Sequence, residues 1–222
     1  MLKLEKNSNI LVLAAHPDDE TLGCGATLAK LSEEGHNIHL MTFTDGVDSR
    51  DEEGAKNRNC KLGEISKLLG INSFNHGDFP DNSMDIIPLL KLCKYIEKNC
   101  PFSPDLIFTH HPNCLNIDHE MVYRATLTAF RPQFGEKQTI LSYFVPSSTD
   151  YNPNANFKGN VYFDIEKRHI HKKTQALIVY KEEMREYPHT RSYQNVCDLM
   201  RVWGSEVGLE NAEKFELIRN II

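Results

Sequence analysis

Two short clusters of histidine and aspartate carry the side chains of this sequence that are best suited to bind a metal ion. In the first cluster, His16 precedes Pro17, and Asp19 lies three residues after the imidazole. An imidazole and a carboxylate at this spacing can converge on one cation, because the proline fixes part of the turn between them. A catalytic zinc ion takes three protein ligands and keeps a fourth position for water. The second cluster, at residues 116–119, supplies candidates for the third ligand.

A further carboxylate, Asp18, lies between the candidate ligands of the first cluster. A carboxylate in this place can take a proton from a water molecule activated by a metal ion. A purely structural interpretation is also available, because Asp18 or Asp19 can cap a helix starting near Thr21, and Asp118 can cap its own helix. The metal interpretation is favoured because both clusters follow strands that a parallel sheet can bring together.

The elements expected around the clusters alternate between strand and helix. Strands are expected at residues 9–15, 38–44, 73–75, 106–109, 140–145 and 161–165. Helices are expected at residues 21–34, 56–69, 86–98, from 118, 167–183 and 192–207, followed by a short tail. This alternation predicts an α/β, Rossmann-like three-layer fold with a mainly parallel sheet flanked by helices. Such sheets bind ligands outside the carboxyl ends of their strands, where both clusters fall.

Length and composition narrow the class of protein. A chain of 222 residues with 40% apolar residues predicts one domain, residues 1–222, with a substantial core. The longest apolar run, residues 10–15, is too short to span a bilayer, and the N-terminus lacks the apolar stretch of a signal peptide. A net charge of −6 argues against a nucleic-acid partner. Six scattered cysteines without a Cys-x-x-Cys pair suit reduced thiols, so we expect a cytoplasmic protein whose oligomeric state stays open.

The chain resembles the PIG-L/LmbE-like family of zinc-dependent N-deacetylases. The family's first motif, Ala-His-Pro-Asp-Asp-Glu, is intact at residues 15–20, and its second motif ends in Asp-His, as residues 118–119 do. Other segments similar to the family are Gly23-Cys24-Gly25-Ala26, Asp45-Gly46-Val47, Phe79-Pro80-Asp81-Asn82 and Ala212-Glu213-Lys214-Phe215. The resemblance therefore extends over nearly the whole chain.

This resemblance implies a hydrolase that removes the N-acetyl group from an amino sugar of the N-acetylglucosamine type, or from its conjugate. It implies that His16, Asp19 and His119 bind one Zn²⁺ per chain and that Asp18 is the general base. Asp18 would take a proton from the attacking water and return it to the departing amine. Fe²⁺ or Mn²⁺ stays open as the native metal, because a set of two histidines and one carboxylate also serves iron enzymes.

The sequence departs from the family at Asn116, where many members carry a second histidine that helps to stabilise the oxyanion. An asparagine can donate one hydrogen bond there, typically worth about 3–4 kcal/mol, but it cannot act as an acid. Asn116, His110 and His111 are therefore the candidates for this role. Asp81 and Arg58 are the candidates for substrate binding, although Asp81 also fits a plain turn and Arg58 a solvated helix position.

Other functions remain as alternatives. Gly23 and Gly25 allow a nucleotide-binding domain, but the third glycine of that motif is replaced by Leu28. Cys114 with His110 or His111 allows a thiol hydrolase, although closeness in sequence does not make a catalytic pair. Two further alternatives remain. One is a zinc-containing carbohydrate-binding module without catalysis, and the other is a hydrolase of another amide on a sugar-like scaffold. His189 and Arg191 either line the far side of the pocket or simply precede a helix, and neither is chosen as a site residue.

Overall fold

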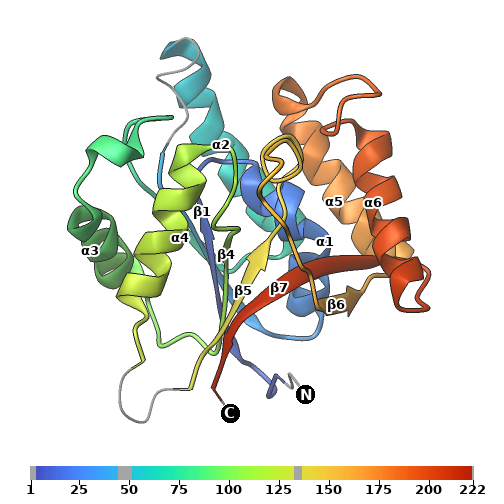
Figure 1. Ribbon diagram of the computed structural model, residues 1–222, viewed down its shortest axis with the longest axis horizontal. Helices are drawn as coiled ribbons and strands as arrows, with labels where there is room; N and C mark the ends of the chain where they lie inside the picture. Colours follow the sequence, from blue (N-terminus) through green and yellow to red (C-terminus); the bar gives the residue numbers. More distant parts are fainter. Residues whose placement is uncertain (1–3, 45–51, 133–136, 222) are drawn as a thin grey trace.

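One mixed sheet of seven strands, in the order β3-β2-β1-β4-β5-β7-β6, forms the middle of the protein (Figure 1). The computed structural model describes residues 4–44, 52–132 and 137–221, without the side chains of residues 52–60. The strands are β1 (Asn9–Ala14), β2 (Asn37–Thr42), β3 (Ser73–His76), β4 (Leu106–His110), β5 (Thr139–Tyr143), β6 (Val161–Asp164) and β7 (Ala212–Asn220). Strands β1 to β5 pair in parallel, whereas β7 runs antiparallel to both β5 and β6.

Helices cover both faces of this sheet, so the predicted three-layer α/β fold is confirmed. The helices are α1 (Asp19–Glu33), α2 (Glu52–Leu69), α3 (Leu89–Asn99), α4 (Ile117–Ala129), α5 (Lys167–Val179) and α6 (Tyr193–Glu206). Two short 3-10 helices, η1 (Met84–Ile86) and η2 (Lys181–Glu183), precede α3 and follow α5. Helices α3 and α4 lie on one side of the sheet, and α5 and α6 lie on the other (Figure 1).

Strand β1 shows why the sheet is buried on both faces. Its alternate residues Ile10 and Val12 join the core beneath α1, α2 and α5, whereas Leu11 and Leu13 join the core beneath α3 and α4. All four side chains are fully buried. A strand covered on both faces needs apolar residues at every position, and this is the continuous run that the sequence contains.

The chain direction across the sheet reverses between β1 and β4. From β1 the chain proceeds to β2 and β3 on one side, and it then returns to place β4 and β5 on the other side of β1. At such a switch point, the loops after the two adjacent strands diverge and leave a crevice at the carboxyl edge. The two His/Asp clusters follow β1 and β4, so both clusters lie at this crevice.

The prediction of a short C-terminal tail is wrong, because Ala212–Asn220 forms β7 between β5 and β6. This strand brings a carboxylate, Glu213, into the core, where it accepts hydrogen bonds from the backbone N–H groups of Ala26 (3.2 Å) and Thr27 (2.6 Å) in α1. The Lys173 ammonium donates to the same carboxylate at 2.6 Å. A buried charge is tolerated when it is paired and hydrogen-bonded in this way.

Several predicted boundaries are also corrected. The helix expected at residues 86–98 is interrupted before Pro88, which is the N-cap of α3. The helix expected at residues 167–183 ends at Val179 and continues as η2. The family-like segment at residues 45–47 lies outside the described residues. Within the described part of the chain, none of the helices is long and apolar enough to cross a membrane.

Candidate metal centre and active site

The turn between β1 and α1 is shaped by its own carboxylates. The backbone N–H of His16 donates to Oδ2 of Asp19 at 2.9 Å, and the N–H of Asp18 donates to Oε2 of Glu20 at 3.1 Å. Asp18 itself has φ 129° and ψ −30°, a backbone conformation that L residues rarely adopt. Strain of this kind costs roughly 1–3 kcal/mol and is concentrated at functional sites. The first motif therefore imposes an unfavourable conformation on the predicted base.

The loop between β4 and α4 holds the second cluster. The side chain of Asn116 caps α4 by accepting a 2.8 Å hydrogen bond from the N–H of Asp118. The two carboxylate oxygens of Asp118 accept hydrogen bonds from the backbone N–H groups of Met84 (2.9 Å) and Asn82 (2.7 Å). Asp118 thus ties the loop after β3 to the start of α4, and His119 follows it on the first turn of the helix.

Three predicted metal ligands converge at the crevice. Oδ2 of Asp19 lies 3.1 Å from Nδ1 of His16 and 3.3 Å from Nε2 of His119. Ligand atoms around a tetrahedral zinc ion, with bonds of about 2.0–2.1 Å, lie about 3.3 Å apart. Oδ1 of Asp19 and Nε2 of His119 are buried and have no hydrogen-bond partner among the described residues. Because a buried polar atom without a partner is costly, this donor set fits a metal ion.

Side chains behind the ligands fix which ring nitrogen faces the centre. Nε2 of His16 lies 3.1 Å from carboxylate oxygens of both Asp118 and Asp81. Nδ1 of His119 lies 3.3 Å from the hydroxyl of Ser148. A metal-binding histidine commonly donates its other ring N–H to a carboxylate or similar acceptor, which fixes the tautomer. The contacts therefore leave Nδ1 of His16 and Nε2 of His119 for a metal ion.

The ionisation states of the ligands follow from their neighbours. Burial alone would lower the pKa of His16, but hydrogen bonds to Asp118, Asp19 and Asp81 raise it well above its usual value. Burial opposes ionisation of Asp19, yet the imidazoles of His119 and His110 hold the pKa of this carboxyl well below its usual range. Without a metal ion, the centre therefore keeps a protonated His16 beside an ionised Asp19.

Asp18 forms an ion pair that the sequence did not predict. Nη1 of Arg191 donates to Oδ2 of Asp18 at 2.9 Å. Burial raises the pKa of Asp18 to about 8, and the positive charge of Arg191 acts against this rise. The neighbouring carboxylates of Asp19 and Glu183 raise the pKa further. A carboxyl whose pKa is moved toward neutrality is suited to take up and release protons at working pH.

A pocket of about 250 Å³ opens beside this ion pair. It is lined by Leu115, Asn116, His119, Ser147, Ser148 and Arg191. The lining residues come from the loop after β4, the start of α4, the loop after β5 and the segment before α6. The long loop at residues 146–160 therefore contributes one wall. Leu115 is 62% exposed at this pocket. A small, mostly polar pocket next to the metal ligands is suited to an acetamido group and its sugar.

The three candidates for oxyanion stabilisation lie in different places. His110 is fully buried, and its Nε2 accepts a 2.8 Å hydrogen bond from the N–H of Ala15. Its ring stacks on His119 with centroids 3.8 Å apart, and burial holds its pKa well below the usual value. His111 points to Glu216 of β7, with Nε2 3.2 Å from the carboxylate. Only Asn116, of these three, lines the pocket.

The substrate-binding candidates also differ. Asp81 lies at the centre, where its Oδ1 contacts His16, and it is 6% exposed. Arg58 falls within α2, in the part whose side chains lie outside the described residues. Asp118 and Arg191 are contributors that sequence reasoning did not select as site residues, although Arg191 was considered for the pocket wall. Asp118 carried a signal, since it precedes His119 in the second motif, whereas nothing near Arg191 in the sequence pointed to Asp18.

The structure provides no support for two of the alternatives. Cys114 is 1% exposed, its Sγ lies 3.0 Å from the hydroxyl of Thr149, and burial raises its pKa to about 12. A nucleophilic cysteine needs a thiolate, so this thiol is unsuited to attack. Gly23 and Gly25 lie inside α1 rather than in a phosphate-binding turn. A side chain at Gly23 would collide with the ring of Tyr143, which explains the need for glycine there.

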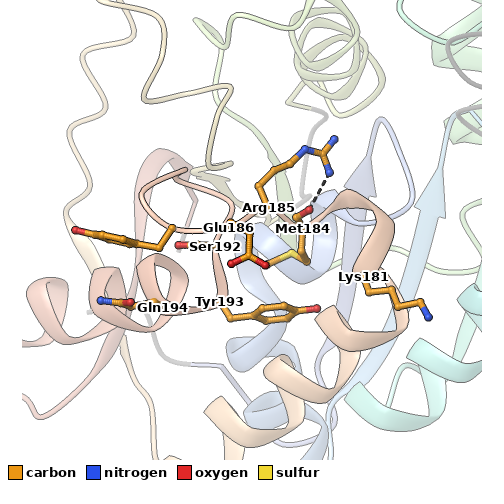
Figure 2. A pocket seen from close by; sticks show the side chains of 8 residues that line it. Lys181, Met184, Arg185, Glu186, Ser192, Tyr193 and Gln194 are labelled. Carbon is orange, nitrogen blue, oxygen red and sulfur yellow. Dashed lines mark hydrogen bonds between the residues drawn. The ribbon is translucent and has the colours of Figure 1, made fainter.

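A second, larger hollow lies on the neighbouring surface. Its volume is about 460 Å³, and its lining residues are Lys181, Met184, Arg185, Glu186, Tyr187, Ser192, Tyr193 and Gln194. In Figure 2, the ring of Tyr193 and the carboxylate of Glu186 lie in the middle, with the guanidinium of Arg185 directed away from them. Because Ser192 lines this hollow and Arg191 lines the pocket at the ligands, the segment before α6 separates the two.

Comparison with known proteins places the site in a family. The PIG-L family model, described as GlcNAc-PI de-N-acetylase, matches residues 11–130, which include both His/Asp clusters. The deacetylase YaiS of Escherichia coli (strain K12), itself described as uncharacterized, is 33% identical over 150 residues, covering 64% of this chain and 77% of that protein.

One further relative and one protein of similar structure have named substrates. The 1D-myo-inositol 2-acetamido-2-deoxy-alpha-D-glucopyranoside deacetylase of Kineococcus radiotolerans is 46% identical over 91 residues, 36% of this chain and 25% of that protein. The N,N'-diacetylchitobiose deacetylase of Pyrococcus horikoshii superposes with a TM-score of 0.74 at 21% identity, covering 95% of this chain and 84% of that one. The second likeness shows a shared fold. Since the family match alone spans more than half of the 222 residues, this chain belongs to the PIG-L family of de-N-acetylases.

Proposed function

We propose that this protein is a zinc-dependent hydrolase that removes the N-acetyl group from an N-acetylglucosamine-type sugar or its conjugate. The observation that carries the proposal is the convergence of His16 Nδ1 and His119 Nε2 on one oxygen of Asp19, with Asp18 next in the chain. The names of the Kineococcus and Pyrococcus proteins support the substrate class, since both are deacetylases of N-acetylated sugars.

His16, Asp19 and His119 are the proposed ligands of one Zn²⁺ per chain. Zinc fits two imidazoles and a carboxylate with a fourth position open, while Fe²⁺ or Mn²⁺ is the alternative for the same set. When bound there, zinc polarises the substrate carbonyl and lowers the pKa of water. Asp118 holds His16 in the required orientation through its 3.1 Å contact with Nε2. His110 supports His119 by ring stacking.

Asp18 is the proposed general base. It takes a proton from the attacking water while the water oxygen forms a bond to the acetyl carbon. The C–N bond then breaks, and Asp18 returns the proton to the departing nitrogen, so the products are acetate and the free amine. Oδ2 of Asp18 is occupied by Arg191, which leaves Oδ1 for this proton. General base catalysis of this kind typically contributes roughly 10²–10⁴-fold to the rate.

Asn116, Asp81 and Arg58 are the proposed contacts to the substrate. Asn116 is supported by its place in the lining of the pocket, where the amide nitrogen already donates to Oδ1 of Asn82 at 2.9 Å. Asp81 is supported by its place beside His16. Arg58 rests on the resemblance to the family alone. The five described cysteines are all free thiols, which supports a cytoplasmic location.

Acetate release from a panel of N-acetylglucosamine conjugates, measured before and after chelation, tests the proposal. We expect acetate release that stops on chelation and returns with zinc. A protein that binds zinc but releases no acetate from any member of the panel favours the non-catalytic carbohydrate-binding module. Release of a different acyl group from the same sugars favours the hydrolase of another amide.

A further inference from the structure

The guanidinium group of Arg191 joins three segments that are far apart in the sequence. Nη1 donates to Oδ2 of Asp18 at 2.9 Å. Nε donates to the hydroxyl of Ser147 at 2.7 Å and to the carbonyl of Pro146 at 3.2 Å. The turn after β1, the loop after β5 and the segment before α6 therefore meet at this one cation.

Arg191 is also the fixed positive charge of the pocket. Among the residues that line it, Leu115, Asn116, Ser147 and Ser148 carry no charge. His119 lines it as well, as one of the proposed metal ligands. The side chain of Arg191 is 18% exposed, so its charge is only weakly screened by solvent.

The backbone around Arg191 holds the guanidinium in place before any substrate arrives. The N–H of Arg191 donates to Nδ1 of His189 at 3.0 Å, and the N–H of Arg185 donates to the carbonyl of Arg191 at 3.4 Å. Nδ2 of Asn195 donates to the carbonyl of Thr190 at 2.8 Å. Charges that are oriented in advance stabilise a transition state more than charges that must reorganise.

Amide hydrolysis places a negative charge on the carbonyl oxygen as the carbon becomes tetrahedral. Nε2 of His110 is occupied by a hydrogen bond from the N–H of Ala15, and Nε2 of His111 is paired with the carboxylate of Glu216. Asn116 lines the pocket but is neutral. Neither buried histidine is therefore available to face this charge, whereas Arg191 is cationic and lines the pocket beside His119.

We infer that Arg191 stabilises the tetrahedral transition state of this reaction and holds the base Asp18 in position. This inference rests on the proposed function, because it assigns a residue to the same hydrolysis. It extends the site beyond the residues 11–130 that match the family model.

The test compares Arg191→Met and Arg191→Lys with the wild type, and Arg185→Met is the matched control. Arg185 is an exposed cation six residues away that lines the larger hollow, and its guanidinium donates to the backbone carbonyls of Glu182 and Met184 (Figure 2). Three quantities are measured: kcat on an N-acetylglucosamine conjugate, the Kd of that substrate, and the Ki of its methylphosphonamidate analogue. The analogue replaces the planar acetamide by a tetrahedral anion. Zinc content and Tm are recorded for each variant.

We expect Arg191→Met to lower kcat by roughly 10²–10³-fold and to raise the Ki of the analogue by a similar factor. The substrate Kd should change by less than about threefold, because the ground state carries no negative charge. Arg191→Lys should recover part of both losses. Arg185→Met should leave all three quantities as in the wild type.

Two results overturn the inference. If Arg191→Met raises the substrate Kd and the analogue Ki by the same factor at full zinc content, Arg191 serves ground-state binding alone. If kcat is unchanged, the residue is structural. A wild-type protein that is inactive on every conjugate instead overturns the proposed function, and the role of Arg191 with it.

Discussion

The carboxylate of Asp118 lies 3.1 Å from Nε2 of His16, and its two oxygens also accept the backbone N–H groups of Asn82 and Met84. One buried side chain thus joins the loop after β3, the start of α4 and a proposed metal ligand. The orientation of His16 therefore depends on a residue outside the proposed set of metal ligands.

Replacing this carboxylate should weaken metal binding without removing a ligand. We expect Asp118→Asn to raise the Kd for zinc by about 10–100-fold, since the amide no longer offers two anionic acceptors. Competition with a chromophoric chelator measures the change. Asp81→Asn is the matched variant, and we expect a smaller effect, because Asp118 still holds His16. An unchanged zinc Kd in Asp118→Asn would show that this contact does not orient the ligand.

Zinc binding should compete with protons at His16. The pKa of His16 in the metal-free protein is raised well above its usual value, so the imidazole is protonated at neutral pH. Zinc must displace this proton, and its apparent affinity should therefore fall as the pH is lowered. Calorimetry in buffers of different ionisation enthalpy should show release of about one proton per zinc ion from this group. Heats that do not depend on the buffer would contradict the protonated state.

Substitutions at Asp18 and His16 should separate the loss of catalysis from the loss of metal binding. Asp18→Asn should keep zinc and lose roughly 10²–10⁴-fold in kcat, because an amide cannot accept the proton. His16→Ala should lose both zinc and activity. Metal analysis and acetate release on the same preparations distinguish the two variants. Full turnover by Asp18→Asn would remove Asp18 as the base.

The buried ion pair between β7 and α5 should be important for stability. Among the described residues, Lys173→Met leaves the buried Glu213 carboxylate with the N–H groups of Ala26 and Thr27 as its partners. Breaking one partner of such a pair typically costs about 3–5 kcal/mol. Urea unfolding of the metal-free protein measures the change. A loss below about 1 kcal/mol would mean that solvent or a rearranged side chain replaces Lys173.

The parts of the site that could be predicted are those encoded near strand ends. His16 and Asp19 follow β1 directly, and His119 follows β4, so the parallel topology brings them together. The apolar runs of β1 and β4 identify both strands without any contact information. Asp118 was visible only as a helix cap, because its contact with His16 crosses the sheet.

The parts that could not be predicted depend on long-range contacts. Strand β7 contains charged residues, and its Glu213 is stable in the core only because Lys173 and α1 supply partners. Arg191 reaches Asp18 across 173 residues of sequence. No local pattern distinguishes such an arginine from a solvated one. The interruption before Pro88 illustrates the same limit on a smaller scale, since the apolar spacing continues through the proline.

The central claim is that His16, Asp19 and His119 together bind the metal. Anomalous diffraction at the zinc edge, from crystals of the zinc-loaded protein, tests it directly. The account predicts one peak per chain at about 2.0–2.2 Å from Nδ1 of His16, Oδ2 of Asp19 and Nε2 of His119. A peak instead bound by His16, Asp81 and Asp118, the other group of possible ligands in the described structure, would contradict it.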